Sequence, residues 1–514
     1  MAEPGSIARP EQLPPTSTSG TEQTSARPRL STGVPGLDTV LGGGLPEGAL
    51  LMIGGPPGAG KTVLAEQIAF HQVARGRHAL ILTTLSEPNE KLIRHIEGFS
   101  WFDRGRLGRE IEFLSLHEIV ERDGMTAAQE TITHWARQHR GGLVVLDAVR
   151  GLGELVDDAL AFRKFLFGLG GQLGVLGATG LITGEYEREE SGRQVEYTIV
   201  DGIVSLQLQL ERQRHLRSLE VVKLRGTDFL NGSHTMHIGA DGVSVYPRHT
   251  AIARVTDYAM GDGRASTGIG GLDTMLSGGL IEHSLTLMVG TPGVGKTLLG
   301  LQFLADGARR GEPGLIATLD ESPAHLEQKA RRIGLGRGGT PFFDGVLLDT
   351  LWEPAVELAP DVLAARLRAA VAARPIRRVV LDAFSNLELI LDPEDLADYV
   401  VALTNFLRGN GVTSLLIRDA VELAGSTVSV GGLTFAATAD NILVLRHVEI
   451  DNRLARVISV VKTRDSDFDP VVRRYSIADD GLGIGEPLQG VEGTMMGLAR
   501  LRTIPAAGPR EPAS

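Results

Sequence analysis

The stretch Gly55-Pro56-Pro57-Gly58-Ala59-Gly60-Lys61-Thr62 follows an apolar run, 49–53, and precedes a segment whose apolar residues recur at helical spacing. In such a Gly-rich turn, successive backbone N–H groups wrap a phosphate chain, the Lys meets the outer phosphates and the Thr hydroxyl reaches Mg²⁺. The stretch therefore predicts a nucleoside-triphosphate site between a strand and a helix.

The same pattern recurs as Gly290-Thr291-Pro292-Gly293-Val294-Gly295-Lys296-Thr297, so the two lysines are 296 − 61 = 235 residues apart. The repeat extends upstream, because Ser31-Thr32-Gly33-Val34-Pro35-Gly36-Leu37-Asp38 is echoed at the same offset by Ser266-Thr267-Gly268-Ile269-Gly270-Gly271-Leu272-Asp273. Two matches in register inside a longer repeat indicate a duplicated domain. We expect both eight-residue loops to bind ATP together with Mg²⁺.

The rest of each half indicates an α/β fold. Helices are expected at 62–75 and 297–310, and short apolar strands at 78–85, 143–146, 178–183, 314–319, 379–381 and 413–417. Apolar strands that alternate with helices are typical of a mostly parallel sheet covered on both faces. Later segments predict β-rich hairpin additions at 196–209, 219–224, 441–448 and 456–462. The expected divisions are a disordered tail (1–29), a first domain (30–248), a linker (249–263), a second domain (264–488) and a C-terminal tail (489–514).

Composition narrows the classes of partner. The chain has 514 residues and a net charge of −12, with 5% aromatic residues and no cysteine. Disulfides, zinc-cysteine sites and thiol catalysis are excluded, and a reducing cytoplasm fits. The negative charge disfavours nucleic acid as a partner. The uncharged stretch between Lys164 and Glu185 is rich in glycine, which favours a helix, a turn and a buried strand over a membrane span.

An acid ends a matching apolar strand in each half. Asp147 follows Leu143-Val144-Val145-Leu146, and Asp382 follows Val379-Val380-Leu381, again 235 residues apart. An Asp at the carboxyl end of such a strand can orient Mg²⁺ and its waters. We therefore expect Thr62, Asp147, Thr297 and Asp382 to form the metal sites.

Further acids follow the next strand along from each phosphate loop. Glu87 in the first half and Asp320-Glu321 in the second are placed to face the outermost phosphate. We expect Glu87 and Glu321 to orient the attacking water as general bases. The alternative is that they are acids that cap the following helices.

With these motifs in place the chain resembles the KaiC-like family of RecA-type ATPases, known from the bacterial circadian clock. The resemblance rests on the Ser-Thr-Gly-x-x-Gly-Leu-Asp openings, the Gly-Gly-Leu turns, both phosphate loops, the acid-tipped strands, Lys-Leu-Arg-Gly-Thr at 223–227 and Glu-Pro-Leu at 486–488. It implies two tandem RecA-like domains, ATP hydrolysis with Mg²⁺, and a homohexamer with nucleotides clamped between protomers. We also expect a protein partner, whose identity the residues do not specify; a KaiB-like protein and a signalling kinase are the candidates.

Lys223, Arg225, Lys462 and Arg464 match the family's positions that reach into the neighbouring protomer's site. An Arg supplied across an interface can stabilise charge on a transferred phosphoryl group. Without the family, the same residues read equally well as exposed bases at a strand end.

Clock members phosphorylate themselves on a Ser-Thr pair, which alignment through Asp440 places at Ala436 and Ala437. Alanine has no hydroxyl, so we expect ATP hydrolysis without that phosphorylation. Three alternatives stay open: an autokinase, a DNA-directed RecA-type motor, and a scaffold that binds ATP without hydrolysing it. The autokinase would use a shifted acceptor among Ser426, Thr427, Ser429, Thr434 and Thr438.

Overall fold

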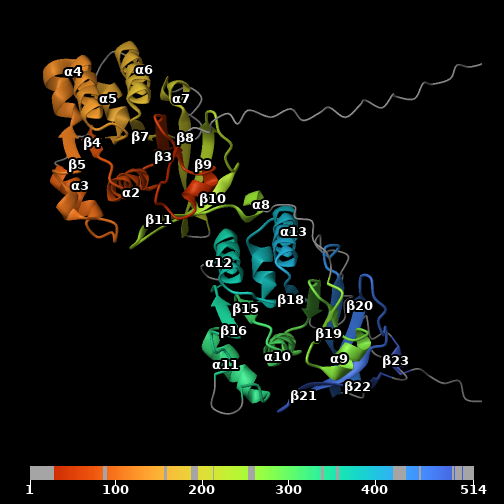
Figure 1. Ribbon diagram of the computed structural model, residues 1–514. Coiled ribbons are helices and arrows are strands. Elements are labelled where there is room, and N and C mark those ends of the chain that lie inside the picture. Colours follow the sequence, from red (N-terminus) through yellow and green to blue (C-terminus); the bar gives the residue numbers. More distant parts are fainter. Residues whose placement is uncertain are drawn as a thin grey trace, which may run out of the picture.

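The structure, a computed structural model, describes residues 28–84, 89–155, 159–186, 195–211, 214–252, 261–336, 341–354, 358–420, 436–450, 453–488, 491–492 and 500–501. Within them the chain forms two nine-stranded sheets, one in each half, flanked by helices (Figure 1). This confirms the predicted pair of tandem α/β domains.

The first sheet has the strand order β11-β10-β9-β8-β3-β7-β6-β4-β5. From β8 to β5 neighbouring strands are parallel, and from β8 to β11 they are antiparallel. The elements are β1 (Arg29–Leu30), α1 (Leu37–Val40), β2 (Leu45–Pro46), β3 (Leu50–Gly55), α2 (Lys61–Ala74), β4 (Ala79–Thr83), α3 (Asn89–Ile96), η1 (Arg104–Arg106), β5 (Ile111–Ser115), α4 (Leu116–Gln138), β6 (Leu143–Asp147), α5 (Val149–Leu155), α6 (Ala159–Leu176), β7 (Thr179–Glu185), α7 (Val195–Ile199), β8 (Gly202–Glu211), β9 (Arg214–Leu224), β10 (Ser233–Gly239) and β11 (Gly242–Tyr246).

The second sheet repeats this plan with the order β16-β15-β17-β18-β14-β19-β20-β21-β22. Its parallel part runs from β16 to β19, and β19 to β22 are antiparallel. The elements are α8 (His249–Ile252), β12 (Arg264–Ala265), α9 (Gly270–Met275), β13 (Leu280–Ile281), β14 (Leu285–Gly290), α10 (Lys296–Arg309), β15 (Gly314–Thr318), α11 (Pro323–Arg332), β16 (Leu348–Trp352), α12 (Pro360–Ala373), β17 (Arg378–Asp382), η2 (Phe384–Leu389), α13 (Pro393–Gly409), β18 (Thr413–Asp419), β19 (Asn441–Ile450), β20 (Arg453–Lys462), β21 (Arg473–Ala478), β22 (Gly481–Pro487), β23 (Val491–Glu492) and β24 (Arg500–Leu501).

Each sheet has a core on both faces because the parallel strands are apolar throughout. In β3, Leu51 and Ile53 join the cluster that contains α2, whereas Leu50 and Met52 join the cluster formed with α4 and α6. Successive side chains of a strand point to opposite faces, so one continuous apolar run serves both layers.

Two predicted segments differ from the structure. Residues 195–199 form the helix α7 rather than the start of a strand. Lys223 donates to the carbonyls of Tyr197 and Val200 at this helix's C-terminal end, where a cation is favourable. The expected irregular C-terminal tail contains a paired β23 and β24.

The uncharged stretch has the predicted form: it contains the end of helix α6, a turn at Gly177 and the buried strand β7. Among the described residues no helix meets the length and hydropathy needed to cross a membrane.

The two halves meet through Asp361, near the start of α12. Its carboxylate accepts hydrogen bonds from the His249 backbone N–H at 2.9 Å and from the Thr235 hydroxyl at 3.2 Å. The His249 ring packs on Tyr399 of α13 with the ring centroids 5.3 Å apart. This contact joins β10 of the first half, and α8 in the predicted linker, to α12 and α13 of the second half (Figure 1).

Candidate active site

Each phosphate loop connects the central strand of its sheet to the following helix. The glycines before the lysines have the left-handed backbone that glycine tolerates best, with φ of 102° at Gly60 and 99° at Gly295. A Cβ on Gly60 would also lie only 2.5 Å from Ile238 Cδ1. The loops are therefore held in a tight turn, and the helix N-terminus that follows each is suited to phosphate.

The loop lysines are positioned by their own loops. Lys61 Nζ donates to the carbonyls of Gly55 and Pro56, both at 2.9 Å. Lys296 Nζ donates to Gly290 O at 2.8 Å and Thr291 O at 3.0 Å. Both ammonium groups thus lie folded back against the turn, where a triphosphate would be cradled.

A Thr–Asp pair stands beside each lysine. Thr62 Oγ1 donates toward Asp147 Oδ1 and Oδ2 at 3.1 and 3.2 Å. In the second half Asp382 accepts a hydrogen bond from the Thr297 hydroxyl. A hydroxyl next to a carboxylate is an oxygen donor set that suits Mg²⁺, so the residues present fit the expected ion.

The backbone after each acid is strained in the same way. Ala148 has φ of 59° and Ala383 has φ of 58°, which non-glycine residues rarely adopt. Burial, with a further contribution from Glu321, raises the pKa of Asp382 to about 6, although the hydrogen bond from Thr297 opposes the shift. Strain and a raised pKa at a shared position are typical of functional sites.

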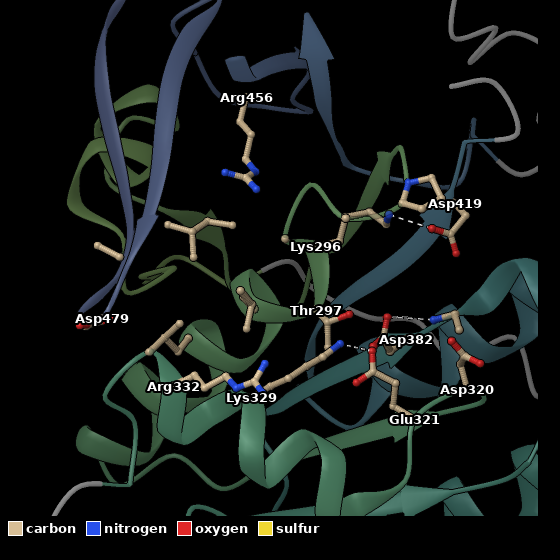
Figure 2. Close-up of a pocket in the computed structure, with 18 residues that line it drawn as sticks. Lys296, Thr297, Asp320, Glu321, Lys329, Arg332, Asp382, Asp419, Arg456 and Asp479 are labelled. Carbon is tan, nitrogen blue, oxygen red and sulfur yellow. Dashed lines mark hydrogen bonds and ion pairs between the residues drawn. The ribbon is translucent and has the colours of Figure 1, made fainter. Parts of the chain in front are cut away.

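The second site opens into a cavity of about 760 Å³ (Figure 2). Asp320 and Glu321 line it beside Asp382, and Lys329 of α11 points toward Glu321, to which it donates a hydrogen bond. The structure thus brings Glu321 to the same cavity as Lys296 and Thr297. Glu87, its predicted counterpart in the first half, lies outside the described residues.

Several residues of this cavity were missed from the sequence. Asp419, at the end of β18, accepts from Lys296 Nζ at 2.8 Å. Arg456 of β20 points into the cavity, which Arg332 and Asp479 also line (Figure 2). In the first half Arg217 reaches Gly58 O at 3.4 Å. A signal was available, because Arg217 and Arg456 each precede the predicted Lys223 and Lys462 by six residues.

One buried acid near the first site also escaped prediction. Glu66 lies one helical turn beyond Thr62 on α2, is 0% exposed, and neither carboxyl oxygen has a hydrogen-bond partner among the described residues. Burial, with a smaller contribution from Asp147, raises its pKa well above the ordinary value. The second half has the apolar Leu301 at the corresponding position.

The predicted Lys-Arg pairs do not enter the sites of their own halves. Lys223 pairs with Ile203, which pairs with Met52, the third residue of β3. Lys462 pairs in the same way with Ile442, which pairs with Leu287, the third residue of β14. The phosphate loops follow the last residues of β3 and β14. Three residues along the strand, about 10 Å, and two strand spacings, about 10 Å, separate each lysine from that end. The pairs are therefore too far from the loops of their own halves to touch the same phosphate.

Comparison with known proteins places this geometry in a family. A family model described as "ATPase: KaiC" matches residues 30–250 and again residues 265–489. The chain belongs to the KaiC family of ATPases. The two matched ranges each contain one phosphate loop, one acid-tipped strand and one Lys-Arg pair.

Curated KaiC proteins align over almost the whole chain. The circadian clock oscillator protein KaiC of Picosynechococcus sp. is 28% identical over 91% of this chain and 92% of its own length. KaiC of Thermostichus vulcanus is 29% identical over 94% of both chains, and the clock protein KaiC3 of Synechocystis sp. is 28% identical over 93% and 95%.

Proposed function

We propose that this protein hydrolyses ATP at two sites per chain and that each site is completed by the Lys-Arg pair of a neighbouring copy in a homohexameric ring. The supporting observation is that the phosphate loop and the Lys-Arg pair of each domain lie at opposite ends of the strands of its sheet. A phosphate loop at one end of the sheet and cations at the other form a heterologous contact between copies, which generates a ring when the rotation between neighbours closes.

Each residue type then has one task. Lys61 and Lys296 hold the outer phosphates, while the Thr and Asp side chains would hold Mg²⁺, which would supply positive charge to the triphosphate when bound. Glu321, and Glu87 in the first half, accept a hydrogen bond from the attacking water and orient it. Arg225 and Arg464 of the neighbour meet the charge that develops on the phosphoryl group, because a planar guanidinium matches its oxygens.

The biological role we propose is a regulator whose nucleotide state is read by a protein partner, KaiB-like or a signalling kinase. The curated relatives carry names of circadian clock proteins, which favours signalling over metabolism. At the positions expected for the clock's phosphorylated pair, Ala436 and Ala437 offer Lys462 only their backbone carbonyls, at 3.4 Å. We therefore propose ATP turnover without that modification.

A complementation experiment tests the shared site. One variant carries Lys61→Ala and Lys296→Ala, and the other carries Arg225→Ala and Arg464→Ala. Each alone should be inactive, whereas mixed rings regain turnover at the interfaces that unite an intact loop with an intact arginine, about a quarter of all interfaces after random mixing. No recovery, with ring assembly verified by mass measurement in ATP, would refute the shared site.

Two further measurements separate the alternatives. Glu87→Gln and Glu321→Gln, made separately, should each lower ATP turnover by the share that the altered site contributes, and unchanged turnover in both would refute their assignment as bases. Binding of ATP with no release of phosphate by the unaltered protein would instead make ATP a structural ligand. Phosphate on any Ser or Thr after incubation with Mg²⁺-ATP would establish an autokinase. ATPase stimulation by single-stranded DNA would favour a nucleic-acid motor.

A further inference from the structure

One aspartate in each half contacts two parts of its own chain. One is the strand that leads to the phosphate loop, and the other is the arginine proposed to act in the neighbouring protomer's site. Asp201 precedes β8 and Asp440 precedes β19. The backbone N–H of Asp201 donates to Leu50 O at 2.8 Å, and that of Asp440 donates to Leu285 O at 2.9 Å. Each aspartate is thus fixed to the first residue of its central strand.

In both halves one carboxylate oxygen contacts the central strand and the other faces the arginine. Oδ2 of Asp201 accepts from the Leu50 backbone N–H at 3.1 Å, and Oδ1 lies 3.6 Å from Arg225 Nη1. Oδ2 of Asp440 accepts from the Leu285 backbone N–H at 2.9 Å, and Oδ1 lies 3.4 Å from Arg464 Nη1. One oxygen therefore holds the strand and the other faces the guanidinium.

A backbone carbonyl holds the other side of each guanidinium. Arg225 Nη2 donates to Thr198 O at 3.4 Å, and Arg464 Nη2 donates to Ala437 O at 3.0 Å. The arginine side chains are nevertheless 55% and 45% exposed. Each guanidinium is therefore oriented by contacts within its own chain and is still partly exposed to solvent. A group that donates to a phosphate bound by another chain needs this arrangement.

We propose that Asp201 and Asp440 are positioning residues. Each holds the arginine that acts in the neighbouring protomer's site in a fixed place relative to the strand that leads to its own chain's phosphate loop. The proposal rests on the proposed function, because it assumes that Arg225 and Arg464 act across the interface. It adds the residues that aim them and a contact between each arginine and the first residue of the strand that ends at the phosphate loop.

The halves differ in how the aspartate is balanced. In the second half the buried Arg408 also pairs with Asp440, whereas glycine occupies the corresponding position, Gly174, in the first half. Removing the charge of Asp440 would leave Arg408 buried without its carboxylate, which is strongly destabilising. Asp201, with a side chain 33% exposed, is therefore the position at which aim can be separated from folding.

The test is a double-mutant cycle at the first site, with Glu321→Gln in every variant so that second-site hydrolysis is suppressed. Asp201→Asn keeps an oxygen for the Leu50 N–H but loses the charge that faces Arg225. It should lower kcat about tenfold with little change in KM, because a misplaced guanidinium weakens only the transition state. Asp201→Glu, which restores the charge, should recover part of the loss.

The cycle is completed by Arg225→Ala and by the double variant. If Asp201 acts through Arg225, the double variant has the same kcat as Arg225→Ala alone. Multiplying losses, or an unchanged kcat in Asp201→Asn, would overturn the inference while leaving the shared site intact. Full activity of Arg225→Ala would instead overturn the proposed function. Thermal unfolding of each variant identifies any loss that comes from misfolding.

Discussion

Asp419 should weaken ATP binding at the second site, because it pairs with the lysine that the triphosphate needs. Lys296 is 7% exposed, and its Nζ lies 2.8 Å from Asp419 Oδ1. Bound phosphate must displace this carboxylate or accept its repulsion. Replacing Asp419 by Asn removes the negative charge and keeps the size of the side chain, so ATP affinity should rise.

The size of the effect follows from the exposure of the pair. Unit charges about 4 Å apart interact by about 4 kcal/mol at an effective dielectric constant of about 20. Asp419 is 44% exposed, so solvent screening reduces its attraction for Lys296 to about 1 kcal/mol. Its direct repulsion of the phosphates brings the total to about 1.4 kcal/mol, which is a tenfold lower Kd.

Titration with a fluorescent, non-hydrolysable ATP analogue measures this, with Lys61→Ala in both the reference protein and the Asp419→Asn variant to suppress binding at the first site. The matched control is Glu185→Gln at the first site, with Lys61 intact and Lys296→Ala suppressing the second site. Glu185 ends the corresponding strand β7, and it raises the pKa of Lys61 less than burial lowers it. The control should change Kd by less than Asp419→Asn. An unchanged or higher Kd in Asp419→Asn would refute the reasoning.

The remaining predictions concern stability. Glu66→Leu, which copies Leu301 of the second half, should stabilise the protein by about 1–3 kcal/mol at pH 7, because it removes a buried acid that has no hydrogen-bond partner among the described residues. The pKa of Glu66 is raised in the folded state, so this gain in the free energy of unfolding should shrink as the pH falls toward 4.5. Urea unfolding at several pH values measures both effects. Burial, aided by a nearby arginine, lowers the pKa of His249 from 6.5 to about 4. The free energy of unfolding should therefore fall by up to about 3 kcal/mol as the pH drops from 6.5 toward 4. His249→Phe should remove this pH dependence. Arg378 is 1% exposed and donates to Glu312 and to two backbone carbonyls. Arg378→Met should therefore lower the free energy of unfolding by about 3–5 kcal/mol, measured by thermal or urea unfolding. The control Arg377→Met, at the exposed neighbouring residue, should lower it by under about 0.5 kcal/mol.

Sequence reasoning succeeded for the fold because its signals are local. The phosphate loops and the acid-tipped strands carry their requirements within a few residues, and the duplication repeats them in register. The strand predicted at 413–417 was found as β18, yet its last residue, Asp419, was missed. Its contact with Lys296 joins the end of β18 to the start of α10, 123 residues earlier in the chain, and no local pattern predicts that pairing.

Tertiary contacts decided the other differences. The segment 195–199 is rich in residues that favour strands, but it forms α7, whose C-terminal carbonyls accept from Lys223. Glu66 occupies a helical position that the periodicity marks as buried, so its charge could have been noticed as an inconsistency. Arg225 and Arg464 lie at the end of the sheet opposite the phosphate loops. Predicting this position would have needed the pairing of β8 with β9 and of β19 with β20, which the sequence leaves open.

Strand β10 gives the contact between the halves a further consequence. Ile238 lies against Gly60 of the first phosphate loop, and Thr235, three residues earlier, donates to Asp361 of the other half. Alternate residues of a strand face opposite sides, so a single strand contacts ATP-binding backbone on one side and the second domain on the other, about 10 Å apart. Cutting the chain in the predicted linker, 249–263, would therefore leave Ile238 against Gly60 but separate the same strand from Asp361, so β10 would lose its support from the second domain next to the first phosphate loop.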